Sequence, residues 1–189
     1  HNKNKIYILA IGGSMTAGFD LPGHRGTWPE VMKDLFASKV IITALAGSGQ
    51  GSEYFSKDPT FWASIKANPP DILIVEFGIN DQQVGLTGME SRTYPQHLYE
   101  FLTRIKQVSP KTQIMALVAS RITTDINHRG IRKYLNELCP VPTEETALTI
   151  YTKSDGVQIA WCHNWWHVAT IQQTVYRELG IPYFSYRDA

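Results

Sequence analysis

Hydrophobic positions along the chain form two kinds of segment, of which the first is a short, continuous apolar run. Runs of this kind between turn residues are typical of strands buried on both faces of a sheet. The clearest is DILIVEF, which follows Asn68-Pro69-Pro70 and ends at Gly78. Strands are predicted at residues 6–11, 40–43, 71–77, 113–118 and 183–186.

The second kind of segment is longer and has apolar residues at helical spacing. Thr27, followed three residues later by Glu30, makes a capping box for the first predicted helix, and Gly180 terminates the last one. Helices are predicted over residues 27–39, 61–66, 94–107 and 162–179. The apolar positions of the first helix are Trp28, Val31, Met32 and Leu35, and those expected to face inward in the third are Leu98, Phe101, Leu102 and Ile105.

Strands that alternate with helices in this way predict an α/β fold, a three-layer α/β/α sandwich around a central parallel sheet of about five strands, flavodoxin-like in type. Residues 120–160 contain Pro140 and Pro142, and a possible helix at 129–138, and we expect them to form a surface excursion. At roughly 150 residues per domain, residues 1–189 fit a single domain.

The composition of the chain argues against several classes of function. The chain is 43% hydrophobic and 19% charged, as expected for a globular protein, and its net charge of +1 with no basic stripe argues against nucleic acid as a partner. No apolar run approaches the roughly 20 residues that span a bilayer. Cys139 and Cys162 are too few for a disulfide framework and lack zinc-ligand spacing.

Small and polar residues follow each of the first three predicted strands. They form the segments GGSMTAG at 12–18, AGSGQGS at 46–52 and GIND at 78–81. In open parallel sheets, chemistry gathers at the carboxyl ends of the strands. We therefore expect the three turns to face one crevice.

The first of these turns carries a hydroxyl that is suited to nucleophilic attack. Ser14 directly follows a buried strand, and a nucleophile there needs a base and donors that stabilise an oxyanion. The backbone N–H groups of Ser14 and Gly49 and the side-chain amide of Asn80 are candidate donors. The alternative is that the turn at 12–18 only reverses the chain or holds a phosphate at a helix start.

Taken together, the three turns resemble the blocks of the SGNH/GDSL hydrolase superfamily over about residues 6–118. Gly78–Asp81 fits the GxND block in full. The first block has Gly13 where the superfamily usually has Asp, and the second, at residues 44–49, has Ala44 in place of Asn. The resemblance implies that Ser14 is the nucleophile and that Gly49 and Asn80 contribute to the oxyanion hole.

The resemblance also implies a DxxH block whose His is the base and whose Asp orients it. The literal candidate that starts at Asp155 has Gln158 where His is required, and an amide does not accept a proton near neutral pH. His163 and His167 stand four residues apart on the predicted last helix, and either could be the base or a metal ligand, although neighbouring tryptophans favour packing. We expect the block to lie beyond Ala189.

Other polar residues near the three turns are candidates for substrate binding. His24 and Arg25 either line the crevice, where they could touch a sugar, or help to cap and pack the following helix. Asp81 is a candidate binding residue whose side chain is expected to tie its own loop to the backbone. Glu76 is a charge within an apolar strand, either buried with a partner or at the sheet edge.

The preferred hypothesis is a serine hydrolase that cleaves a carboxylic ester, such as an O-acetyl or other acyl group on a carbohydrate or small molecule. It needs no metal or organic cofactor, and its expected partner is the ester substrate alone. The alternatives are a catalytically silent binding module of the same fold, an O-acyltransferase that uses the same site and, more distantly, a flavodoxin-like nucleotide binder. The oligomeric state and the compartment are not predicted.

Overall fold

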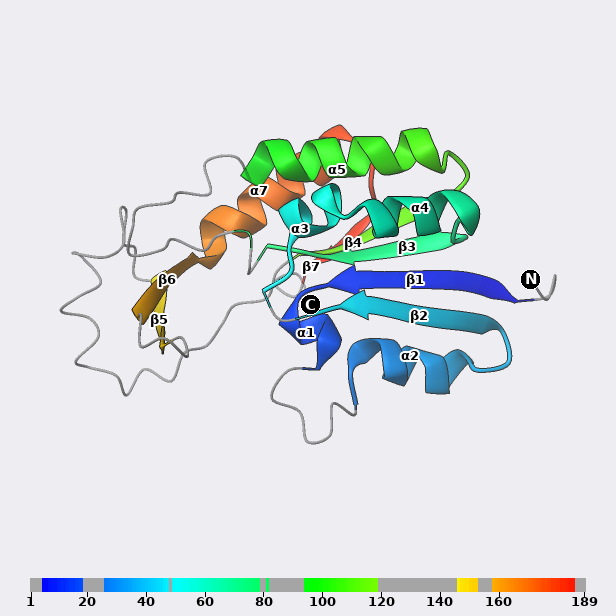
Figure 1. The fold of residues 1–189 in the computed structure, drawn as a ribbon, viewed down its shortest axis with the longest axis horizontal. Coiled ribbons are helices and arrows are strands. Elements are labelled where there is room, and N and C mark those ends of the chain that lie inside the picture. The colour runs from blue at the N-terminus through cyan, green and yellow to red at the C-terminus, as the bar shows by residue number, and fades with distance from the viewer. Residues whose placement is uncertain are drawn as a thin grey trace.

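A five-stranded parallel sheet forms the centre of the computed structural model (Figure 1). The structure describes residues 5–18, 26–47, 49–78, 81, 94–118, 146–152 and 158–185. The strands lie in the order β2-β1-β3-β4-β7. Their bounds are Ile6–Gly12 (β1), Val40–Ala46 (β2), Ile72–Glu76 (β3), Gln113–Val118 (β4) and Tyr183–Ser185 (β7). This order matches the flavodoxin-like arrangement, so the predicted fold class is confirmed.

Continuous apolar runs produce the strands at the centre of the sheet. In β1 and β3, side chains on both faces are buried, including Leu9, Ala10, Leu73 and Ile74. The edge strand β2 is more exposed, and it extends three residues beyond the predicted 40–43 because its backbone continues to pair with β1 as far as Ala46.

Helices α3, α4, α5 and α7 cover one face of the sheet (Figure 1). They span Ser52–Lys57, Pro59–Ala67, Tyr94–Val108 and Trp165–Glu178. The main core lies between them and the sheet. The predicted inward face of α5 is confirmed, since Leu98, Phe101, Leu102 and Ile105 are all buried.

Two helices lie on the opposite face, α1 (Ser14–Ala17) and α2 (Trp28–Phe36) (Figure 1). The predicted capping box is present, with the Thr27 side chain accepting from the Glu30 N–H and the Glu30 carboxylate accepting from the Thr27 N–H. The apolar stripe of α2 is only partly covered, and Leu35 is 71% exposed. The reason is position, because α2 packs mainly on the edge strand β2.

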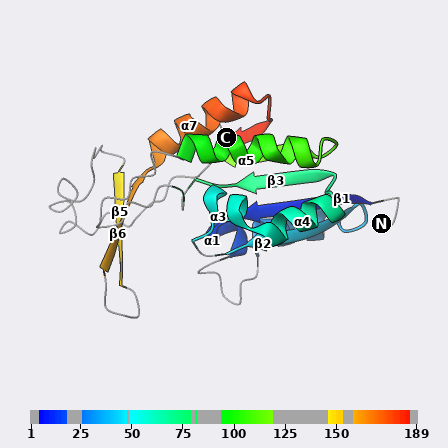
Figure 2. The same cartoon turned by 45° about the horizontal axis from the view of Figure 1, so that its top comes forward.

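The region before the last helix differs from the prediction. Residues Cys162–Asn164 belong to a strand, β6 (Gln158–Asn164), which pairs antiparallel with β5 (Thr146–Thr152), and α7 begins only at Trp165. The hairpin stands apart from the main sheet (Figure 2). Within the surface excursion predicted for 120–160, the structure therefore describes two strand segments, whereas the possible helix at 129–138 lies outside the described residues.

On the face of the sheet that α7 also covers, the predicted helix at 61–66 is confirmed as part of α4, whereas the preceding α3 was not predicted. Tyr186, the last residue of the predicted fifth strand, lies outside the described residues.

Over the part of the chain that the structure describes, no helix has the length and apolar character that crossing a bilayer requires.

Candidate active site

Ser14 lies where β1 ends and the one-turn helix α1 begins. Gly13 is the N-cap residue, and its carbonyl accepts from the Ala17 N–H at 3.1 Å. Ser14 is half-buried, while the preceding residues Ile11 and Gly12 are buried. The strand thus carries the serine from the core to the surface, as predicted, and the short helix orients it there.

A buried polar cluster supports α1 from beneath. The Thr16 hydroxyl, 1% exposed, donates to the Glu76 carboxylate and accepts from the Trp28 indole N–H at 3.2 Å. Of the two alternatives for Glu76, the structure places it buried with a partner, because β3 lies between β1 and β4 in the sheet. Glu76 therefore connects β3 to α1 and, through Thr16, to the start of α2.

Burial raises the pKa of Glu76 above its usual value, and the hydrogen bonds to Thr16 oppose the rise only in part. A carboxyl whose pKa is raised by folding binds more protons in the native than in the unfolded state, so its contribution to stability is present at low pH and is lost as pH rises. We expect Glu76→Gln to flatten the decline in unfolding free energy from about pH 4.5 upward. Urea unfolding across pH 4–8 measures this.

The matched control for that experiment is Glu53→Gln on α3. The Glu53 side chain is exposed, and its hydrogen bond and ion pair with Lys57 lower its pKa. Its contribution is therefore lost as pH falls, which is the opposite sign. Equal pH profiles for the Glu76→Gln variant and the wild type would contradict the assignment of Glu76 as a buried carboxyl with a raised pKa.

The second turn follows β2 and contains Gly49. Gly49 has φ = 75°, a left-handed conformation that glycine adopts without strain, and the Gln50 N–H donates to the Gly47 carbonyl at 3.2 Å. The turn leads into α3 at Ser52. It therefore reverses the chain at the same edge of the sheet at which Ser14 emerges, as the sequence predicts.

The third turn follows β3 and is held by Asp81. One oxygen of its carboxylate accepts from the Gly78 N–H at 2.9 Å, and the other accepts from the Ser52 N–H at 2.7 Å and from the Ser52 hydroxyl. Burial raises the pKa of Asp81, while the hydrogen bonds from Ser52 and Gly78 act against the rise. Asp81 ties its loop to the backbone, as expected, and it also joins the third turn to the second.

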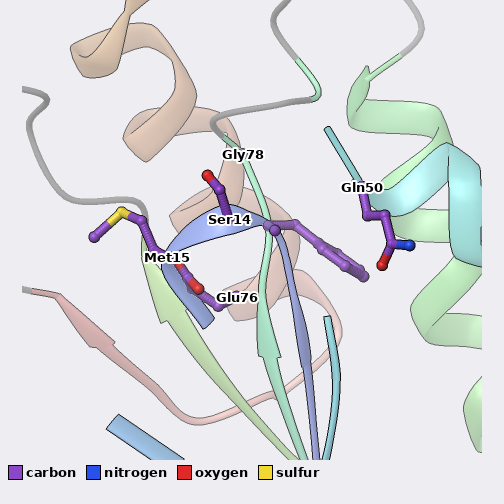
Figure 3. Close-up of a pocket in the computed structure, with 7 residues that line it drawn as sticks. Ser14, Met15, Gln50, Glu76 and Gly78 are labelled. Atoms are coloured by element: carbon purple, nitrogen blue, oxygen red, sulfur yellow. The ribbon is translucent and has the colours of Figure 1, made fainter. Parts of the chain in front are cut away.

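Residues from all three turns line one pocket (Figure 3). The lining residues are Gly13, Ser14, Met15, Gln50, Glu76, Phe77 and Gly78. The pocket lies at the ends of β1 and β3, where the strand order reverses and where open α/β sheets bind their ligands. Among the described residues, no group of three or more His, Cys, Asp or Glu side chains could hold a metal ion.

Several predicted site residues lie outside the described residues. Asn80, His24 and Arg25 are among them, as is Asp155 of the rejected DxxH match. The prediction that His163 and His167 both lie on the last helix is wrong, because His163 lies in β6, opposite Ala147, and only His167 lies in α7. An i, i+4 pairing on one helix therefore does not exist.

The comparison with protein families decides what kind of protein has this arrangement. The sequence profile of the GDSL-like Lipase/Acylhydrolase family matches residues 10–189. The chain belongs to this family. The match includes the Ser14 turn and extends through the last strand, so the resemblance seen in the three turns is confirmed at the level of the family. No curated protein sequence matches the chain.

Solved structures show the GDSL-like fold over nearly the whole chain. An acetyl xylan esterase, AlAXEase, superposes with a TM-score of 0.60 at 12% identity, covering 97% of this chain and 78% of that one. A protein from Lactobacillus plantarum gives 0.59 at 20% identity, covering 100% and 80%. A lipase/acylhydrolase from Enterococcus faecalis gives 0.54 at 15% identity, covering 94% and 74%.

Two residues at the GDSL-like site were not identified from the sequence. Thr16 is the hydroxyl partner of Glu76, and Gln172 of α7 donates from its side-chain amide to the Phe77 carbonyl at 2.6 Å. Gln172 has a sequence signal, because it stands four residues after Val168 and four before Tyr176 on the buried stripe of α7. A glutamine at a core position needs a hydrogen-bond partner, which indicates a polar contact beneath the site.

Proposed function

We propose that this protein is a serine esterase in which Ser14 attacks the acyl carbon of a carboxylic ester. Membership of the GDSL-like family supports ester hydrolysis as the class of chemistry. The observation that carries the proposal is the convergence of three turns, distant in sequence, on the pocket beside Ser14.

In this mechanism the tetrahedral intermediate carries its negative charge beside the turns. The N–H groups of Ser14 and Gly49 and the carboxamide of Asn80 donate to the oxyanion. Ser14 lies in the first turn of α1 and Gly49 in the turn before α3, so both amides belong to segments whose ends are fixed by hydrogen bonds. Such preorganised donors cost no reorganisation when the charge develops.

A histidine oriented by an aspartate takes the proton from Ser14 and passes it to the leaving alcohol, and in the second half-reaction it activates water. We propose that this pair belongs to a DxxH block of the kind that the superfamily resemblance implies. Asp81 is not the orienting residue, because its carboxylate is already occupied by Ser52 and Gly78.

For the substrate we propose an O-acyl group, such as acetyl, on a carbohydrate or a small alcohol. The acetyl xylan esterase among the similar structures supports this class. The exposed Met15 and the buried Phe77 are apolar residues at the pocket, suited to contact a short acyl chain, while Gln50 offers a polar amide.

A fluorophosphonate probe tests the proposal directly. Ser14 in the natural full-length protein should be phosphonylated, the adduct should map to the peptide that contains residues 13–17, and heat denaturation should prevent labelling. Ser14→Ala should remove the label. A folded protein that stays unlabelled would instead indicate a catalytically silent module, because a serine without a base reacts slowly.

A further inference from the structure

The peptide bond between Phe77 and Gly78, where β3 ends, is hydrogen-bonded at both of its polar atoms. Its carbonyl oxygen accepts from the Gln172 side-chain amide at 2.6 Å, and its N–H donates to the Asp81 carboxylate at 2.9 Å. The two partners belong to elements far apart in the sequence. Together they fix the orientation of this peptide plane.

The chain at this point has a conformation that needs such support. Gly78 has φ = 119°, a region that residues with a side chain rarely adopt. This dihedral angle sets the direction in which the chain continues beyond Gly78. A rotation of the preceding peptide would therefore redirect the whole third turn.

Gln172 is well suited to hold the peptide because it is itself fixed. Its side chain is 0% exposed, in the middle of the buried stripe of α7, and the same amide nitrogen lies 3.5 Å from the Tyr176 hydroxyl. A buried amide that loses its partner carries the full cost of desolvation, so alternative rotamers are disfavoured. The carbonyl of Phe77 is thus held by a side chain with little freedom.

The other partner connects the peptide to the second turn. Asp81 accepts from Ser52, the first residue of α3, and a Cβ atom on Gly51 would come within 2.7 Å of the Asp81 carboxylate. The close approach leaves no room for a side chain at that position. The Gly49 turn, the Gly78 turn and α7 are therefore linked through two side chains, Asp81 and Gln172.

We propose that Gln172 is a positioning residue for the third turn, and that by fixing the Phe77–Gly78 peptide it sets the direction in which Asn80 presents its carboxamide to the oxyanion. This inference rests on the proposed function. Gln172 acts through the backbone of the turn and does not touch the substrate. Its loss should therefore affect transition-state stabilisation more than substrate binding.

Gln172→Met tests this role, because methionine keeps the length and apolar contacts of glutamine and removes the donor. We expect kcat for p-nitrophenyl acetate to fall roughly tenfold or more, with KM changed less than about threefold. The matched control is Gln173→Met, which makes the same change at the next, half-buried position of α7 and should leave kcat close to wild type. Wild-type kcat for Gln172→Met would overturn the proposal.

A second variant keeps the test valid if the methionine variant does not fold. In Gln172→Glu, a protonated carboxyl can donate to the Phe77 carbonyl, whereas an ionised one repels that oxygen and the Asp81 carboxylate nearby. The phenols of Tyr94 and Tyr176 face the same position and stay protonated, since burial raises their pKa. Activity relative to wild type should therefore rise as pH is lowered, and a constant ratio would overturn the proposal.

Hydrogen exchange separates this inference from the proposed function. With glycine-selective ¹⁵N labelling, the Gly78 amide should exchange at least tenfold faster in Gln172→Met than in wild type, while Gly12 in β1 is unchanged. This readout needs no enzymatic activity. If Ser14→Ala shows that the serine is not catalytic but Gly78 exchange still depends on Gln172, the proposed function fails and the positioning role of Gln172 stands. If Gly78 exchange is unchanged in Gln172→Met, the positioning role of Gln172 fails and the proposed function is not affected.

Discussion

Replacing Ser14 by alanine is expected to lower kcat/KM for p-nitrophenyl acetate in the natural full-length protein by about 10³-fold or more. The hydroxyl at the end of β1 is the proposed nucleophile, and without it the remaining donors only polarise the carbonyl for attack by water. The small side chain also leaves the backbone of α1 intact, so the free energy of unfolding should change little. Initial rates of nitrophenol release, together with urea unfolding, measure both effects.

Ser64→Ala is the matched control for this prediction. Ser64 is an exposed serine in α4, its hydroxyl donates to the Phe61 carbonyl at 2.9 Å, and it does not line the pocket. This variant should retain wild-type kinetics. Hydrolysis by Ser14→Ala at a rate comparable with the Ser64→Ala variant would remove Ser14 from the mechanism, whatever the family of the protein.

The sheet could be predicted from the sequence because the apolar run of each central strand shows by itself that the strand is buried. A continuous run such as DILIVEF has nowhere to lie except between two covered faces, and the parallel order then follows from the helices between strands. The start of α2 could be predicted for a similar reason, since Thr27 and Glu30 form their cap locally. Interactions within one segment, or burial on both faces, leave a clear pattern in the sequence.

The region before α7 could not be predicted in the same way. Residues 162–164 are the last three residues of β6. Their apolar and aromatic neighbours are compatible with a strand or a helix, and their pairing partners in β5 lie more than ten residues away in the sequence. The pairing that decides between the two states is therefore a tertiary interaction. The assignment of His163 to a helix was wrong for this reason.

The sequence predicted the three turns of the candidate site. It did not predict the buried side-chain contacts that hold these turns in place. The three turns are visible as small residues after apolar runs, because glycine is needed where φ is positive, as at Gly49 and Gly78. The contacts Thr16–Glu76 and Gln172–Phe77 join residues 60 and 95 positions apart. Nothing in the local sequence encodes such distances, although a polar residue on an apolar stripe shows that a partner must exist.

Gly12→Ala is expected to be among the most destabilising substitutions near the site. A Cβ atom at this position would come within 2.9 Å of the Glu76 carbonyl oxygen and of the Thr16 Cβ, and it would also meet the Thr16 hydroxyl. Gly12 is paired with Ala46 on one side and Glu76 on the other, so neither strand can move away freely. We expect a loss of roughly 2–3 kcal/mol in the free energy of unfolding, the usual cost of overpacking.

The same substitution should also lower esterase activity in the fraction that remains folded, because relief of the clash has to displace Thr16 and with it the one-turn helix that orients Ser14. Gly26→Ala is the control: a Cβ there meets nothing within 4 Å, and the cost is limited to its φ of 81°, about 1 kcal/mol. Urea unfolding and kcat of both variants measure the difference. If Gly12→Ala were no more destabilising than Gly26→Ala, the close packing of β1, β3 and α1 beneath the serine would be wrong.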